Sequence, residues 1–183
     1  MSDRHVLPPS VVWFTGLSGA GKTTIASAVH DALTGRTIPV EYLDGDRIRA
    51  LFPGTGFTRE ERDAHVRRVG QMASCLEQDG ITAICALISP YRDARREVRG
   101  LCRRFFEVHV STPLAECERR DPKGLYARAR RGEIRNFTGI DDLYEVPEAP
   151  ELSLDTTDLP VDAAVTRVLS LIGAYDRCPS VPR

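Results

Sequence analysis

The sequence predicts an α/β protein in which helices cover both faces of a five-stranded parallel sheet. Short apolar runs alternate along the chain with segments whose apolar residues recur at helical spacing. Strands buried on both faces read as such continuous apolar runs, and a helix between successive strands makes those strands parallel. We expect the strands at residues 11–14, 40–43, 81–88, 105–110 and 152–154.

The intervening helices follow from their apolar stripes and end signals. The first carries Ile25, Val29 and Leu33 on one face, and Gly35 suits its carboxyl end. A second is expected at residues 59–77, and the last follows Pro160. Because no internal repeat or linker is apparent, we predict a single domain, residues 1–183.

Residues 121–150 break this alternation. The segment is polar, basic in its first half, and rich in glycine and proline, with a short helical piece possible at residues 126–131. Long irregular segments of this kind in compact domains tend to be functional loops. We predict a mobile lid or substrate loop rather than part of the sheet.

Composition narrows the possible partners and location. The 25 Lys and Arg residues against 26 Asp and Glu give a net charge of -1, so no overall field favours nucleic acid or a membrane surface. An anionic ligand therefore needs a local cluster of cations. The five cysteines form no CxxC pair, and neither a signal peptide nor an apolar run of membrane-spanning length is present, which predicts a cytoplasmic protein with reduced thiols.

A glycine-rich motif follows the first predicted strand and opens the first predicted helix. Residues 16–23, GLSGAGKT, match the phosphate-binding pattern G-x-x-x-x-G-K-[ST] in the context that it requires. Backbone amides curl around phosphates there, Lys22 reaches the β and γ phosphates, and the Thr23 hydroxyl can bind Mg²⁺. This predicts a three-layer P-loop NTPase-type fold that binds ATP and Mg²⁺ through Gly16, Ser18, Gly19, Ala20, Gly21, Lys22, Thr23 and Thr24.

Polar residues also follow the second and third predicted strands, at the sheet edge where ligands bind in open α/β folds. Asp44 and Asp46 flank Gly45, and Asp46 is the better candidate to orient or deprotonate an attacking hydroxyl, or to hold Mg²⁺. An ordinary Asp-Gly turn is the alternative. Ser89 could touch the metal or phosphates, or cap the next helix.

Taken together, these segments resemble the adenylylsulfate kinase family over nearly the whole chain. The resemblance lies in GLSGAGKTT at 16–24, LDGDRIR at 43–49, GFTREER at 56–62, ISPYRDARREVR at 88–99 and, most specifically, RDPKGLYARARRGEIRNFTGIDDLYE at 120–145. It implies an enzyme, commonly homodimeric, that uses Mg²⁺ and ATP to convert adenylylsulfate to 3′-phosphoadenylylsulfate and ADP.

The resemblance also implies residue roles. Asp46 would assist the acceptor 3′-hydroxyl with support from Asp44, and Ser89 aligns with a serine proposed as a phosphoenzyme site in some members. Phe57 and Phe137 would sandwich the acceptor adenine. The cations implied around the phosphosulfate and the transferring phosphate are Arg49, Arg62 and Lys123.

The chain departs from the family pattern at His65, where asparagine is usual, and at Leu143, where proline is usual. His65 lies three residues after Arg62, so both side chains are expected on one helical face toward the acceptor anion. An imidazole of ordinary pKa, about 6.5, would bind that anion more weakly as pH rises from about 6 to about 8.

Three other functions compete with this interpretation. A related kinase could phosphorylate another nucleotide-linked 3′-hydroxyl or a sugar-like acceptor. A nucleotide switch lacks both an N/T-K-x-D segment and a reason for an arginine-rich lid with two exposed aromatics. A catalytically dead interaction protein would have no need to retain Lys22, Thr23, Asp44 and Asp46.

Overall fold

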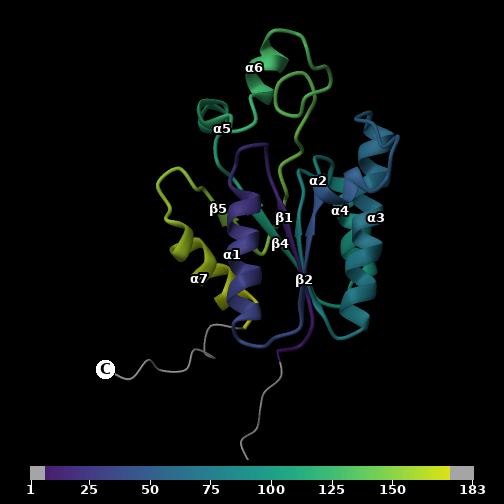
Figure 1. Ribbon diagram of the computed structural model, residues 1–183, viewed down its shortest axis with the longest axis vertical. Helices are drawn as coiled ribbons and strands as arrows, with labels where there is room; N and C mark the ends of the chain where they lie inside the picture. Colours follow the sequence, from purple (N-terminus) through teal and green to yellow (C-terminus); the bar gives the residue numbers. More distant parts are fainter. Residues whose placement is uncertain (1–6, 174–183) are drawn as a thin grey trace, which may run out of the picture.

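The computed structural model describes residues 7–173, which are built around a parallel sheet with strand order β2-β3-β1-β4-β5 (Figure 1). The strands are β1 (Val11–Thr15), β2 (Val40–Asp44), β3 (Thr82–Ala86), β4 (Phe105–Val110) and β5 (Leu152–Leu154). All strand pairs are parallel; in the centre, Val12 lies opposite Ile84 on one side and Phe106 on the other. The predicted α/β fold and its strands are confirmed.

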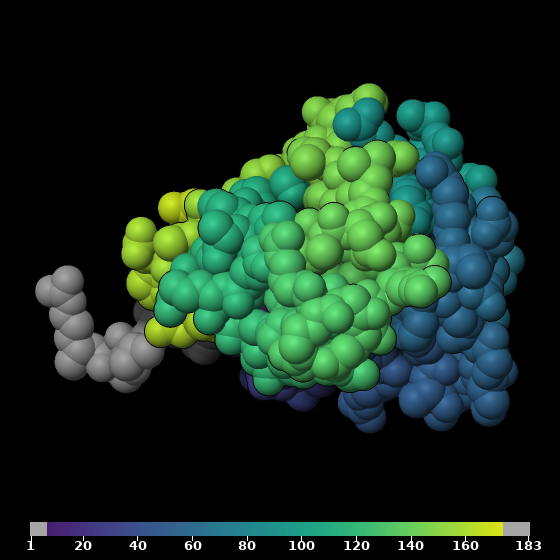
Figure 2. Space-filling view, turned by 90° about the horizontal axis from the view of Figure 1, so that it is seen from above, coloured from purple at the N-terminus to yellow at the C-terminus, as the bar shows by residue number. Residues whose placement is uncertain are grey.

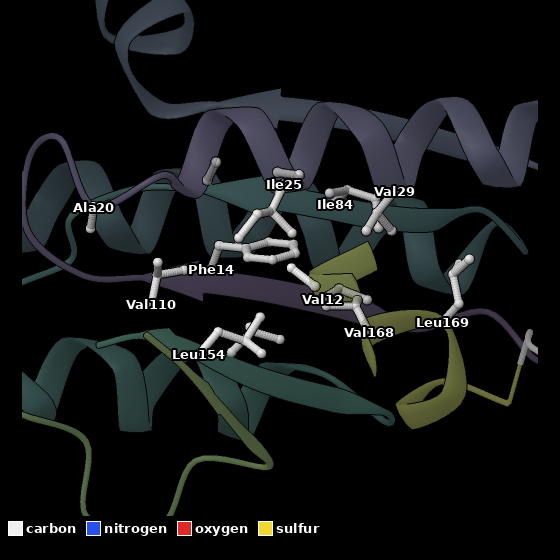
Figure 3. Packing of buried hydrophobic residues seen from close by; sticks show 14 of the residues in the cluster. Val12, Phe14, Ala20, Ile25, Val29, Ile84, Val110, Leu154, Val168 and Leu169 are labelled. Atoms are coloured by element: carbon white, nitrogen blue, oxygen red, sulfur yellow. The ribbon is translucent and has the colours of Figure 1, made fainter. Parts of the chain in front are cut away.

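Helices cover both faces of the sheet and bury two apolar layers. On one face α1 (Lys22–Thr34) and α7 (Val161–Leu171) enclose Phe14, Ile84 and Leu154, which pack side by side in Figure 3. On the other face α3 (Arg59–Gln78) and α4 (Arg92–Leu101) cover a layer that includes Trp13 and Val98. The fully buried strand β1 therefore lies in the middle of the sheet, between the two apolar layers.

Three short helices lie above the carboxyl ends of the strands. They are α2 (Gly45–Ala50), α5 (Leu114–Arg120) and α6 (Leu125–Arg130), of which α5 and α6 stand at the top of Figure 1. The helical piece expected near residues 126–131 is α6, whereas α2 and α5 were not predicted. Seen from above, the segment 121–150 covers the middle of this face, with the region around α2 beside it (Figure 2). We call residues 121–150 the lid.

A buried arginine attaches the end of the lid to the sheet. Arg95 of α4 donates from Nη1 to the Ser89 carbonyl and from Nη2 to the Glu145 carbonyl, each at 2.6 Å. Its Nε lies 2.8 Å from Oε1 of Glu107 on β4, an ion pair without hydrogen-bond alignment. Tyr144 adds a hydroxyl contact of 3.0 Å to Thr15 at the end of β1. The end of the lid is thus fixed to β1, β4 and the loop after β3.

Among residues 7–173, no helix combines the length and apolar character needed to cross a bilayer.

Candidate active site

A cavity of about 950 Å³ opens at the carboxyl edge of the sheet, beneath the lid. This volume is at the upper end of the range for small-molecule sites. The chain brings to it residues that are as many as 120 positions apart, because the parallel strands end at this edge and the lid covers it. The predicted site residues that line the cavity are Ser18, Gly19, Gly21, Lys22, Thr23, Thr24, Asp44, Asp46, Arg49, Phe57, Arg62, His65, Ser89, Lys123 and Phe137. Gly16 and Ala20 of the predicted set are buried behind it.

The glycine-rich loop between β1 and α1 has the backbone that a phosphate cradle needs. Gly19 and Gly21 have φ values of 74° and 103°, which favour glycine. A Cβ on Gly16 would lie 2.4 Å from the Val110 carbonyl oxygen, so only glycine lets the loop pass so close to β4. The loop delivers its amides at the start of α1, a helix of 13 residues whose amino terminus favours anions.

Lys22 is the buried cation of this loop. Its Nζ donates to the Leu17 carbonyl at 2.7 Å, which folds the side chain back over the loop. Burial lowers the pKa of Lys22 to about 8, and Lys123 acts in the same direction, while Cys117, Asp46 and Asp44 oppose it. The ammonium therefore lies within reach of phosphates that the loop would hold.

The two carboxylates after β2 have different surroundings. Asp44 caps α2, because its Oδ1 accepts from the backbone amides of Asp46 and Arg47 at 3.0 Å, and its Oδ2 accepts from the Tyr42 hydroxyl at 3.2 Å. Asp46 projects from the first turn of α2 with an exposed side chain, and its Oδ2 pairs with Lys123 Nζ at 2.5 Å. Both carboxylates line the cavity, but Asp44 is committed to local structure, and Asp46 is the more exposed of the two.

Ser89 follows β3 in a left-handed conformation, with φ of 40°, and is almost fully buried. Its hydroxyl accepts a hydrogen bond from the Trp13 indole at 3.1 Å, and its carbonyl accepts from Arg95. The alternative that Ser89 caps the next helix is wrong, because α4 begins after Tyr91 without a side-chain cap. Ser89 thus lines the cavity, with its hydroxyl held by the Trp13 indole.

The two aromatic residues differ in exposure. Phe57 is 57% exposed at the cavity rim, with the Arg49 guanidinium 4.7 Å from its ring centroid. Phe137 is only 8% exposed, because it packs edge-on against Tyr126 with ring centroids 5.0 Å apart. The expectation of two exposed aromatics was therefore wrong for Phe137, which still contributes to the cavity lining.

Arg62 holds together the two segments that carry these rings. Its three nitrogens donate to the Phe57 carbonyl at 2.9 Å, the Thr138 hydroxyl at 2.9 Å and the Asn136 carbonyl at 2.6 Å. Arg49 similarly donates to the Gly56 carbonyl at 2.6 Å. Both arginines line the cavity but are already bonded to main chain, so they shape the site in addition to supplying charge.

His65 lines the cavity but does not have the charge that its sequence position suggested. Its side chain is buried, and Nε2 lies 3.0 Å from the Gly45 carbonyl, which favours the tautomer protonated at Nε2. Burial, followed by the positive charge of Arg49, lowers the pKa of His65 to about 4. The expectation that His65 changes charge between pH 6 and pH 8 was therefore wrong, because the imidazole is neutral throughout that range.

Sequence reasoning missed several cations of the cavity. Eight lysines and arginines line it against two aspartates, so the cavity is built for anions although the whole chain carries a net charge of -1. The arginine-rich composition of the lid was the only sequence signal for part of this set. The cations that were not assigned individually are Arg47, Arg120, Arg128 and Arg135.

Comparison with known proteins places this cavity in a family context. The profile described as adenylylsulphate kinase matches residues 8–155. The chain is 50% identical to the adenylyl-sulfate kinase of Citrobacter koseri, over 95% of this chain and 89% of the relative. It is 49% identical to that of Gloeothece citriformis, over 86% of this chain and 90% of the relative. It is also 50% identical to the bifunctional enzyme NodQ of Azospirillum brasilense over 90% of this chain, but spans only 27% of that protein.

Solved structures that resemble this chain include members of the same family. The APS kinase CysC of Mycobacterium tuberculosis, in complex with AMPPNP and APS, superposes with a TM-score of 0.87 and 41% identity, over 91% of this chain and 98% of that one. A hexameric APS kinase from Thiobacillus denitrificans gives a TM-score of 0.69 and 37% identity, over 92% of this chain and 30% of that one.

Proposed function

Because the chain belongs to the adenylylsulphate kinase family, we propose that it transfers the γ-phosphoryl group of ATP to the 3′-hydroxyl of adenylylsulfate. The products are ADP and 3′-phosphoadenylylsulfate. The observation that carries this proposal is the joint lining of one cavity by a phosphate cradle, by the rings of Phe57 and Phe137, and by eight cations. A nucleotide donor and a second, anionic nucleotide acceptor both fit these features.

Each part of the site has a role in the proposed transfer. The acceptor hydroxyl oxygen forms a bond to the γ-phosphorus while the bond from that phosphorus to ADP breaks, and Asp46 takes the hydroxyl proton. Lys22 leaves the Leu17 carbonyl and stabilises charge on the migrating phosphoryl group. Lys123 leaves Asp46 for a phosphate oxygen when both substrates are bound.

Mg²⁺ is the metal that this donor set suits. The Thr23 hydroxyl and the Asp46 carboxylate are exposed oxygen donors lining the same cavity. Mg²⁺ commonly takes one or two protein oxygens and completes its shell with phosphates and water. When bound, it would neutralise phosphate charge during transfer.

We also propose that the protein forms homodimers and works in the cytoplasm. The first proposal rests on the family resemblance. The second rests on the cysteines of the sequence, whose odd number and lack of a CxxC pair favour reduced thiols.

The proposed activity is tested by measuring ADP formation with adenylylsulfate, other nucleotides and simple sugars as acceptors. We expect adenylylsulfate to give the highest kcat/KM. Lys22→Ala should lower turnover by orders of magnitude, because the migrating phosphoryl group loses its buried cation. Asp46→Asn should lower kcat much more than it weakens ATP binding. Preference for a sugar or for another 3′-hydroxyl would identify the alternative kinase activity instead.

A further inference from the structure

The lid rests directly on the phosphate cradle. The Tyr126 hydroxyl, from α6, donates to the Ser18 carbonyl at 2.9 Å. Elsewhere in the lid, Gly139 approaches so closely that a Cβ there would lie 3.0 Å from Leu17 Cδ2. The lid is therefore fixed at its start by a hydrogen bond to the loop that would hold the phosphates, and farther along by van der Waals contact with it.

Tyr126 also supports one wall of the acceptor side of the cavity. Its ring meets the Phe137 ring edge-on, with centroids 5.0 Å apart and an interplanar angle of 84°. The backbone of Phe137 is fixed separately, because its amide donates to Asp141 Oδ1 at 2.6 Å. With the main chain held by Asp141, the Tyr126 ring is an aromatic contact that limits where the Phe137 side chain can lie.

We propose that Tyr126 is a positioning residue that sets the distance between the nucleotide cradle and the acceptor-binding ring of Phe137. The proposal rests on the proposed function, since it takes Phe137 as a contact of the adenylyl acceptor. Tyr126 is almost fully buried and stands behind both Ser18 and Phe137, so it acts through them rather than on a substrate.

A single rigid side chain suits this task. The side chain has two torsions, and here its hydroxyl is held by a hydrogen bond and its ring by a T-shaped aromatic contact. Burial raises the pKa of Tyr126, so the hydroxyl keeps the proton that it donates. Because phosphoryl transfer depends on the separation of donor and acceptor atoms, a shift of about 1 Å in the Phe137 wall is expected to matter.

The test is a double-mutant cycle between the Tyr126 hydroxyl and the Phe137 ring. Tyr126→Phe removes the bond to Ser18 but keeps the ring. We expect it to raise the acceptor KM about threefold to tenfold at saturating ATP, the range for one lost hydrogen bond. Phe137→Ala should raise the acceptor KM on its own. In the double variant the Tyr126→Phe effect should vanish to within about twofold, because Tyr126 acts through the ring that is gone.

Tyr144→Phe is the matched control. It removes a hydroxyl contact of 3.0 Å between the same lid and Thr15, at the end of β1 rather than on Ser18. We expect a similar change in thermal midpoint for the two Tyr→Phe variants, with the rise in acceptor KM confined to Tyr126→Phe. If the wild-type enzyme is active but the Tyr126→Phe and Phe137→Ala effects on the acceptor KM multiply in the double variant, the two residues act independently. That result would overturn the role proposed for Tyr126 and leave the proposed function standing. Wild-type activity in the same assay tests the proposed function separately.

Discussion

Replacing Arg95 with methionine removes the guanidinium that joins the lid to the sheet while keeping most of the side-chain volume. The Glu107 carboxylate would stay buried with Arg99, 3.4 Å from its Oε2, as the remaining cation nearby. The carbonyls of Ser89 and Glu145 would each lose a donor at 2.6 Å. Removing one partner of a buried ion pair typically costs about 3–5 kcal/mol. Because Arg99 still offers partial compensation, we expect a loss near the lower end, about 3 kcal/mol.

The assay is urea unfolding followed by circular dichroism at pH 7. Arg96→Met is the control, since Arg96 is the next residue of α4, its side chain is 69% exposed, and its pair with Asp93 is worth under about 1 kcal/mol. The double variant Arg95→Met with Glu107→Met should recover part of the loss, because no buried carboxylate is left without its main partner. Equal losses for Arg95→Met and Arg96→Met would refute this account of the buried pair.

Two further predictions concern single positions. The pKa of His65 is lowered to about 4, so the folded protein binds fewer protons than the unfolded chain between about pH 4 and pH 6.5, and stability should fall as pH drops through that window. His65→Asn should lessen this acid destabilisation in urea titrations and leave the pH 6–8 profile of the acceptor KM unchanged. Gly70→Ala should cost about 1–3 kcal/mol in thermal or urea unfolding, because its Cβ would lie 2.4 Å from Val98 Cγ2, whereas Gly100→Ala meets nothing within 4 Å and should be neutral or stabilising.

The sequence predicted the sheet well because its strands are buried on both faces and read as unbroken apolar runs. It missed α2 because Asp44-Gly45 is a common turn pair; the helix forms where the Asp44 side chain caps the amides of Asp46 and Arg47. The position of the P-loop was predictable from one local motif. In contrast, the sequence did not predict that Arg62 joins the segments carrying Phe57 and Phe137, or that Arg95 attaches the lid to the sheet. Apart from the Glu107 carboxylate beside Arg95, the partners described for them are carbonyl and hydroxyl groups, up to 76 residues away in the case of Arg62, and no side-chain pattern marks a carbonyl.

The exposure of Phe137 and the charge of His65 were unpredictable for a related reason. Both depend on what covers the residue, and the covering groups come from other elements. Tyr126 lies eleven residues before Phe137 and buries its ring. Gly45 lies twenty residues before His65 and accepts from its ring in a dry environment. The polar sequence around each residue instead indicated an exposed Phe137 ring and a His65 whose charge changes between pH 6 and pH 8.

The central place of β1 in the sheet has a consequence for how the protein is made. Residues 11–15 leave the ribosome first among the strands, yet their neighbours are residues 82–86 and 105–110. At about 5–20 residues per second, the run Val11, Val12, Trp13 and Phe14 waits roughly 5–20 s for β4 to appear. Until β3 appears this four-residue apolar segment has no partner strand on either side, and until β4 appears one of its two sides stays unpaired. We expect early ribosome-bound chains to bind holdase chaperones at this segment, and release to follow synthesis of β4.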